Sequence, residues 1–185
     1  MNNKEEYINL LRSTNRKGVE ELITYLETTD FYNAPASTRY HNSKPGGLLE
    51  HSLNVYRALK ELNGYCGLYD NETLVIVALL HDICKIGFYT MSMRNVKRVG
   101  QWYSEPYYIV EDTSPLGHGE KSVIMALQMI PLKTEEIYAI RWHMGGFEPK
   151  ENYNYVSGAF SKFGLALMLH MADLKATYYM EGKND

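Results

Sequence analysis

Two histidines and two carboxylates occupy places in this sequence where apolar side chains are expected. His51 lies in the segment LLEHSLNVYRAL, which has the apolar spacing of a helix, and the doublet His81–Asp82 ends the apolar run LVIVALLHDICK. Asp173 lies inside a third apolar run, LALMLHMADLKA. Burying an ionised carboxylate is costly unless the carboxylate is paired or holds a metal ion. These residues therefore need partners that the apolar runs themselves do not supply.

A metal centre would satisfy all of these groups together. Four of the six histidines lie at the ends or on the apolar faces of four separate expected helices. Neutral imidazole and carboxylate oxygen are the ligands expected for Mn, Fe, Co, Ni or Zn. Each residue alone has a simpler interpretation, because a single buried histidine is usually a hydrogen-bonded core residue and a single buried aspartate usually pairs with arginine or caps a backbone. The joint pattern favours the metal centre.

Composition and charge suit one compact domain. The chain has 185 residues, of which 45% are hydrophobic, and a net charge of −3. This charge gives no general attraction to nucleic acid or to an anionic membrane. Cys66 and Cys84 are too few for a disulfide framework, and no run has the length of a signal-peptide core or of a membrane span. We therefore expect a cytoplasmic protein with no membrane partner.

The spacing of apolar residues predicts a mostly helical chain. Helices are expected over two short stretches within 4–28 that divide near Asn15, over 48–62, over 71–84 with Asn71 as cap, from His118 to a break at Pro131, over 135–144, and over 157–180. The segment 94–110 is rich in Val, Ile, Tyr and Trp, with Gly100 and Pro106 as punctuation. This composition predicts a β-hairpin inserted between helices.

The same residues resemble a known family, the HD-domain metal-dependent phosphohydrolases, whose pattern is a histidine, a His–Asp doublet and a later aspartate. The resemblance runs from about residue 39 to 173, and its specific parts are GGLLEHSLNVYRAL and HDICKIG. These look most like the HD domain of bacterial 3′–5′ exoribonucleases. HDICK also resembles the HDIGK of HD-GYP cyclic-dinucleotide phosphodiesterases, although the sequence contains no GYP motif.

The resemblance implies an all-α HD-domain helical bundle with a core over 35–175. With the hairpin insertion that composition predicts over 94–110, we expect a single domain over 1–185. It also implies one metal ion bound by His51, His81, Asp82 and Asp173. Relatives with additional histidines bind a second ion, which His118 and His143 would complete here with Asp82 as the bridge. The alternative is that His118 caps a helix and His143 interacts with a helix dipole.

Basic residues near these ligands are candidates for phosphate binding. In two-metal relatives, a lysine three residues after the doublet contacts phosphate, so Lys85 is expected to bind substrate and to serve catalysis with Asp82. The alternative is a solvated surface lysine. Arg39, Lys44 and Arg141 are further candidates for substrate binding.

The expected hairpin combines basic and aromatic side chains, namely Arg94, Lys97, Arg98, Trp102, Tyr103, Tyr107 and Tyr108. Such a combination suits a nucleotide, through phosphate contact and base stacking. The simpler alternative, which we expect, is that the aromatic side chains pack on the helices.

The leading functional hypothesis is a hydrolase of phosphate esters that uses hydroxide activated by two divalent transition-metal ions. Its substrate would be a small nucleotide or a short oligonucleotide, without a stable nucleic-acid complex. Two alternatives stay open: a one-metal phosphomonoesterase of the 5′-nucleotidase type, and a metal-stabilised regulatory module without catalysis.

Overall fold

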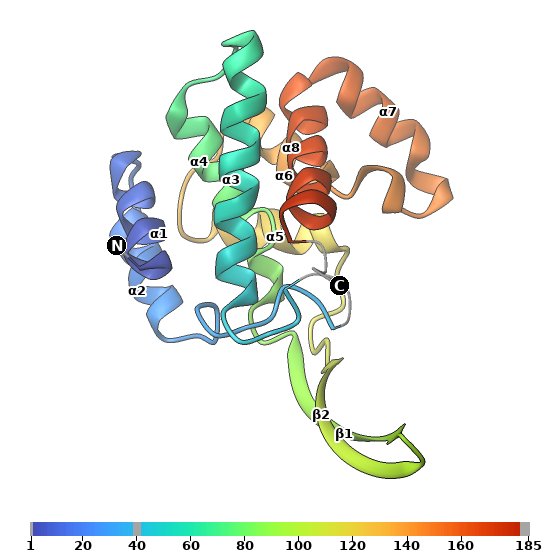
Figure 1. The fold of residues 1–185 in the computed structure, drawn as a ribbon. Helices are drawn as coiled ribbons and strands as arrows, with labels where there is room; N and C mark the ends of the chain where they lie inside the picture. Colours follow the sequence, from blue (N-terminus) through green and yellow to red (C-terminus); the bar gives the residue numbers. More distant parts are fainter. Residues whose placement is uncertain (1, 39–41, 182–185) are drawn as a thin grey trace.

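The computed structural model describes residues 2–38 and 42–181 and shows a body of helices with one projecting hairpin (Figure 1). The helices are α1 (Asn3–Ser13), α2 (Val19–Glu27), α3 (Gly47–Cys66), α4 (Asn71–Leu80), α5 (His118–Leu127), α6 (Thr134–Trp142), α7 (Tyr153–Lys162) and α8 (Gly164–Lys175). The strands are β1 (Tyr89–Arg98) and β2 (Gln101–Val110). The predicted fold class, a helical bundle with a small hairpin insertion, is confirmed.

The core is built around α3 and α4. Helix α3 packs against α1, α4 and α8, while α6 packs against α4, α5 and α8. Every side chain of α4 from Thr73 to Leu80 is buried, which explains why this helix is apolar all round rather than on one face. No helix within the described residues is long and apolar enough to cross a membrane.

The end of α4 differs from the prediction in a way that matters for the site. The predicted helix over 71–84 stops at Leu80, and its cap is Asp70, whose side chain accepts a hydrogen bond from the Thr73 amide at 2.7 Å. Asp82 leaves the helical region with φ −110° and ψ 16°, and a 3₁₀ turn follows over Ile83–Lys85. His81 keeps helical φ and ψ, so the departure begins at Asp82, whose carboxylate lies beside His118 of α5 and His143 after α6.

The last predicted helix, over 157–180, is wrong as a single element. Phe163 is extended, with φ −126° and ψ 89°, and separates α7 from α8. Its ring stacks on Tyr138 of α6 with centroids 4.1 Å apart. A side chain at Gly164 would come within 3.1 Å of the Tyr69 hydroxyl. These contacts come from distant parts of the chain, so helical spacing alone did not predict the break.

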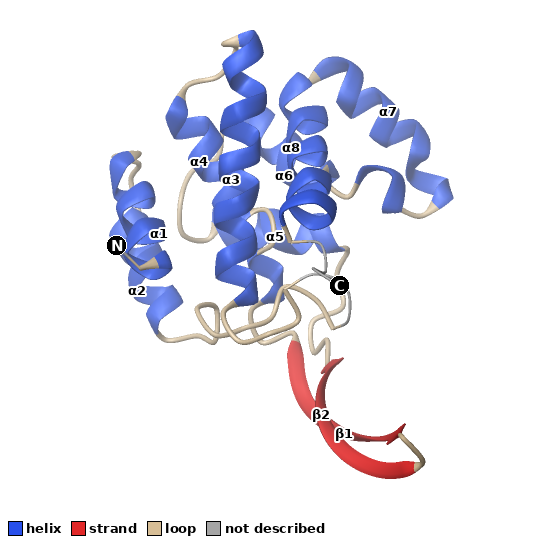
Figure 2. Cartoon of the chain, in the orientation of Figure 1, coloured by secondary structure: helices blue, strands red, loops and turns tan. Residues whose placement is uncertain are grey.

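The hairpin begins five residues before its predicted start and projects from the helical body (Figure 2). Its strands pair antiparallel, and the two turn residues, Val99 and Gly100, both have positive φ. Positive φ at both central positions is typical of the two-residue turns that match strand twist. The expectation that the aromatic side chains pack on the helices is wrong for the outer part of the hairpin, because Trp102 is 68% exposed and Tyr103 is 50% exposed.

Candidate metal centre

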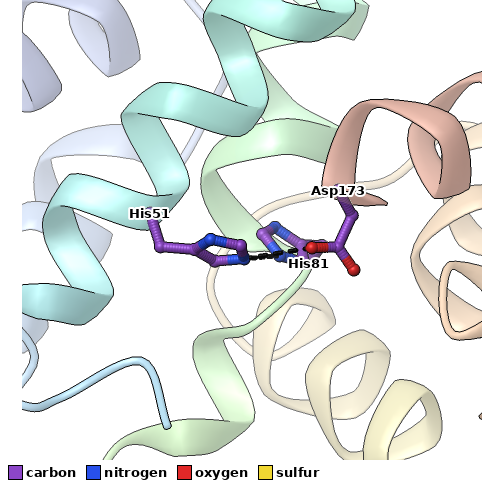
Figure 3. Close-up of side chains that lie close together, drawn as sticks. All are labelled: His51, His81 and Asp173. Carbon is purple, nitrogen blue, oxygen red and sulfur yellow. Dashed lines mark hydrogen bonds and ion pairs between the residues drawn. The ribbon is translucent and has the colours of Figure 1, made fainter. Parts of the chain in front are cut away.

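Four helices and the turn after α4 bring the six predicted metal ligands together. The ligands are His51 on α3, His81 and Asp82 directly after α4, His118 at the start of α5, His143 directly after α6, and Asp173 on α8. Figure 3 shows three of them, with the His51 and His81 rings and the Asp173 carboxylate converging from separate elements. The His51 Nε2 atom lies 3.2 Å from Asp173 Oδ1 and 3.3 Å from His81 Nε2. These three residues form one group with the spacing of metal ligands.

Asp82 lies between this group and the remaining histidines. Its Oδ2 atom is 3.4 Å from His81 Nε2 and 3.7 Å from His51 Nε2. Its Oδ1 atom is 2.6 Å from His118 Nε2 and 3.6 Å from His143 Nε2. The two carboxylate oxygens therefore face two different pairs of imidazoles, and Asp82 is only 3% exposed.

Two of the imidazoles have their tautomer determined by the backbone. His81 Nδ1 lies 2.9 Å from the Ala78 carbonyl oxygen, and His143 Nδ1 lies 2.7 Å from that of Ile140. Because a carbonyl oxygen only accepts, Nδ1 must carry the proton and donate in both rings. In the neutral ring Nε2 is then a lone-pair atom directed at the cluster.

The His143 Nε2 atom is the clearest indication that the residues fit a metal. It is buried and has no hydrogen-bond partner among the described residues. A buried acceptor without a partner costs free energy that a bound cation would recover. Imidazole nitrogen and carboxylate oxygen are also the donor set that transition ions take, so the residues present fit a divalent transition metal.

The electrostatics of the cluster point to the same need for positive charge. Burial lowers the pKa of His51, but the carboxylates of Asp173 and Glu181 raise it by more, and the resulting pKa is about 10. Burial likewise lowers the pKa of His118, but its hydrogen bond to Asp82 outweighs this and raises it to about 9. Protons on these imidazoles balance the buried carboxylates here, and a metal ion would replace them.

Lys85 is buried at the cluster and is not a solvated surface lysine. Its Nζ atom lies 2.6 Å from Asp82 Oδ2 and donates to the Ala36 carbonyl at 2.7 Å. Burial lowers the pKa of Lys85, but the neighbouring Asp82 carboxylate raises it more, so the side chain is a cation. Burial raises the pKa of Asp82 in turn, and Lys85 with His81 and His118 brings it well below its usual range.

A cavity of about 590 Å³ opens onto these groups. Its lining includes His51, Asp82, Lys85, His118 and Asp173. Other parts of the lining come from residues 36–38, from the base of the hairpin and from the end of α8. This volume lies within the range of small-molecule sites, about 300–1,000 Å³.

The other predicted phosphate ligands are placed differently. Lys44 is exposed and pairs with Glu50 at 2.8 Å, outside the described lining of the cavity. Arg141 pairs with Glu120 and, at 2.9 Å, with Glu148, and its guanidinium lies over the Trp142 ring in a separate pocket. Both cations are thus engaged by acidic side chains away from the cavity. Arg39 lies outside the described residues, so its role stays a prediction.

Sequence reasoning missed Glu181. This side chain is fully buried, and its Oε2 atom lies 3.1 Å from His51 Nδ1. Its Oε1 atom accepts a hydrogen bond from Asn54 at 2.9 Å. A carboxylate on the far nitrogen of a ligand imidazole orients the ring and increases its basicity. No sequence signal marked Glu181, because it follows the last apolar run and lies 130 residues from His51.

Cys84 and His170 also support the site from behind. The Cys84 sulfur lies 3.4 Å from His118 Nδ1, and the Cys84 amide donates to Ser122 on α5. His170 on α8 donates from Nδ1 to the His143 carbonyl at 2.7 Å. Cys84 therefore contacts an expected ligand directly.

A model of the HD-domain family matches residues 48–168. The chain belongs to the HD-domain family. The matched segment contains His51, the His81–Asp82 doublet, His118 and His143, and it ends before Asp173, which the structure places beside His51. Searches of curated proteins and of solved structures gave no match. HD domains are generally metal-dependent phosphohydrolases, and the His/Asp cluster of this HD domain is suited to bind metal.

Proposed function

We propose that this HD domain hydrolyses phosphate esters of nucleotides or short oligonucleotides with two divalent metal ions that share Asp82. The observation that carries the proposal is the position of the Asp82 carboxylate, whose Oδ2 faces His51 and His81 while Oδ1 faces His118 and His143. One ion would be held by His51, His81, Asp82 and Asp173, and the other by Asp82, His118 and His143. Such ions, when bound, supply hydroxide at neutral pH and neutralise charge on phosphoryl oxygens.

The chain's own residues provide for phosphate binding, exclusion of bulk water and room for the substrate. Lys85 brings a compact positive charge to the cavity wall, where it can bind a phosphate oxygen without competing as a metal ligand. The buried cluster excludes bulk water from the ligand nitrogens, since His51, His81 and His143 are each at most 1% exposed. The open cavity beside the cluster has room for a phosphate ester and its leaving group.

Metal counting tests the shared carboxylate. After saturation with Mn²⁺, elemental analysis of the purified protein should give two ions per chain, and bis-p-nitrophenyl phosphate should be hydrolysed. His143→Ala should reduce the count to one and reduce diester hydrolysis by about 100-fold or more, because the second ion would lose a ligand. Glu61→Gln, an exposed carboxylate variant near the far end of α3, should change neither value.

Different outcomes separate the alternatives. One ion per chain, together with full activity of His143→Ala, would leave a one-metal phosphomonoesterase. Two ions without hydrolysis of any phosphate ester would leave a regulatory module. Lys85→Ala should keep the metal content and lose turnover; unchanged turnover would remove Lys85 from the proposed phosphate site.

A further inference from the structure

One face of the hairpin carries a row of exposed apolar and aromatic side chains. Alternate residues of a strand share a face, and the cross-strand pairs of this face are Tyr89 with Val110, Met91 with Tyr108, Met93 with Pro106, Asn95 with Ser104, and Lys97 with Trp102. We call these ten residues the hairpin strip. Met91, Met93 and Trp102 are each at least 60% exposed. The polar pair Asn95 and Ser104 separates the inner apolar side chains from Trp102. Exposed apolar side chains gathered on one face mark a binding site more often than scattered ones do.

The inner end of the hairpin strip forms part of the wall of the 590 Å³ cavity beside the His/Asp cluster, called the metal cavity below. Tyr89 and Val110 both line that cavity. The Tyr89 hydroxyl donates to the Ala36 carbonyl oxygen, which also accepts from Lys85 Nζ. A ligand whose phosphate lies beside the cluster can therefore continue onto the hairpin strip without leaving the protein surface.

The length of the hairpin strip excludes a mononucleotide as its full occupant. Trp102 precedes Val110 by eight residues along β2. At about 3.3 Å per residue, the two side chains are roughly 26 Å apart along the strand. Only an extended chain, anchored at the metal cavity, reaches both ends.

The charge of the hairpin selects among extended chains. Between residues 89 and 110 there are three basic side chains, Arg94, Lys97 and Arg98, and one acidic side chain, Glu105. The hairpin is thus net positive on a chain whose total charge is −3. Arg94 and Arg98 lie on the opposite face, where both pair with Glu105. Lys97 is therefore the charged side chain of the hairpin strip, which has no carboxylate. Lys97 Nζ lies 5.9 Å from the centroid of the Trp102 ring. An exposed ring with a cation beside it suits a base and its phosphate, whereas a second copy of the hairpin would bring like charges together.

We infer that the hairpin strip binds the bases of a single-stranded oligonucleotide whose terminal phosphate ester lies in the metal cavity. The inference rests on the proposed phosphohydrolase function and narrows its substrate to single strands of about four or more nucleotides, the lower limit of known single-strand sites. Trp102 is the outer stacking residue, and Lys97 is its phosphate contact. Substrates too short to reach Trp102 are hydrolysed without using the outer hairpin.

Substrate length provides the kinetic test. Trp102→Ala should raise KM for the octanucleotides U8 and dT8 by about tenfold, the loss expected for one stacked base. Hydrolysis of bis-p-nitrophenyl phosphate should be unchanged, because that substrate fits within the cavity. The matched control is Tyr65→Ala, another exposed aromatic side chain, at the far end of α3, which should behave as wild type with both octamers and the small diester.

A binding measurement separates this inference from the proposed function. Fluorescein-labelled U8 and dT8 are titrated by anisotropy in EDTA, which stops metal-dependent hydrolysis. The chain has two tryptophans, so Trp142→Phe leaves Trp102 as the sole indole, and octamer binding should quench its emission. Lys97→Gln should weaken binding of both octamers and reduce the salt dependence by about one counterion.

Each result supports or overturns the inference. If octamer binding depends on Trp102 but the protein hydrolyses no phosphate ester, the hairpin strip is supported as a binding site and the proposed hydrolase function is contradicted. Equal octamer affinity of wild type and Trp102→Ala would contradict binding at the hairpin strip, even if the small diester is hydrolysed. Loss of a dimer in Trp102→Ala, seen by sedimentation without any effect on octamers, would assign the surface to a second copy of the chain. A preference for U8 or dT8 would identify the sugar of a supported ligand.

Discussion

At the scale of single residues, Glu181 is a buried carboxylate that contacts the candidate metal ligand His51. It contacts His51 Nδ1 at 3.1 Å, while His51 Nε2 faces the cluster. Glu181→Gln keeps a hydrogen-bond acceptor but removes the charge that raises the basicity of the ring. We expect the affinity for the ion held by His51 to fall by about tenfold, measured by competition with a chelator.

In Glu181→Gln, the pKa of His51 distinguishes an electrostatic role of Glu181 from a purely structural one. Because Glu181 contributes to the high pKa of His51 in the metal-free protein, that pKa should fall in Glu181→Gln when followed by NMR titration. Glu61→Gln serves as the control for charge removal at a distance. An unchanged His51 titration would reduce Glu181 to a packing residue.

Protonation of His51 and His118 predicts that the stability of the metal-free protein falls as the pH rises, while its affinity for metal increases. Their pKa values in the metal-free fold, about 10 and about 9, lie above the unfolded value of 6.5. Their contribution to stability is therefore complete below pH 6.5 and is lost as the pH rises through 9–10. Metal ions compete with these protons, so metal affinity should instead increase with pH over the same interval.

Two measurements check these signs. Thermal unfolding in EDTA should show decreasing stability between pH 7 and 10, after which the contribution of both imidazoles is gone. Calorimetric titration of Mn²⁺ at pH 7.5, in two buffers of different ionisation enthalpy, should show proton release from the protein. Proton uptake, or an affinity that falls with pH in this range, would contradict the predicted protonation states.

At the scale of elements, the approach of α5 to α6 determines where His118 lies relative to His143. A Cβ atom at Gly119 would be 2.1 Å from the Arg141 carbonyl oxygen, so the two helices meet at the glycine backbone. Gly119→Ala must separate them, at a cost of about 1–3 kcal/mol in the free energy of unfolding. Because His118 is the adjacent residue, the proposed second ion should bind more weakly to Gly119→Ala than to wild type, as measured by metal counting across a Mn²⁺ titration.

A glycine on α7 provides the matched control. A Cβ atom at Gly158 would meet nothing within 4 Å among the described residues, so Gly158→Ala places its methyl group in open space. This variant should stabilise the protein by about 0.5–1 kcal/mol through helix propensity and leave both ions bound. If Gly119→Ala were equally stabilising, close helix contact would not be what positions His118.

At the scale of the whole molecule, Arg16 joins the segment before α2 to α4 and α6. Its guanidinium pairs with Glu72 and Glu136, each at 2.5 Å, and the Glu136 side chain is fully buried. Arg16→Ala leaves that carboxylate buried without its cation, so we expect a loss of about 3 kcal/mol in the free energy of unfolding. Chemical denaturation measures this loss.

The double variant Arg16→Met with Glu136→Leu tests the cause. Removing both charges avoids the uncompensated carboxylate, so much of the lost stability should return. The metal content of folded protein should stay at the wild-type value in both variants, because Arg16 does not contact the cluster. A double variant as unstable as Arg16→Ala would show that packing, not charge, dominates at this position.

The sequence alone determined the ligand types and most of the elements. His51, His81, Asp82 and Asp173 interrupt apolar runs, and a polar group in such a run needs a partner wherever the run is buried. The division near Asn15 and the hairpin were likewise local properties, since Asn15 and the Val99–Gly100 turn adopt positive φ. Helical and strand spacing could predict these features because each depends on neighbours only a few residues away.

Which elements face one another depends on contacts between distant parts of the chain. Glu181 reaches His51 across 130 residues, Phe163 breaks a helix to stack on Tyr138, and Arg141 is engaged by Glu120 and Glu148 instead of lining the cavity. Periodicity reports that a face is buried but not what buries it, because the contact depends on how distant helices pack. The candidate metal ligands could therefore be named from sequence, whereas the residues that contact them from behind required the fold.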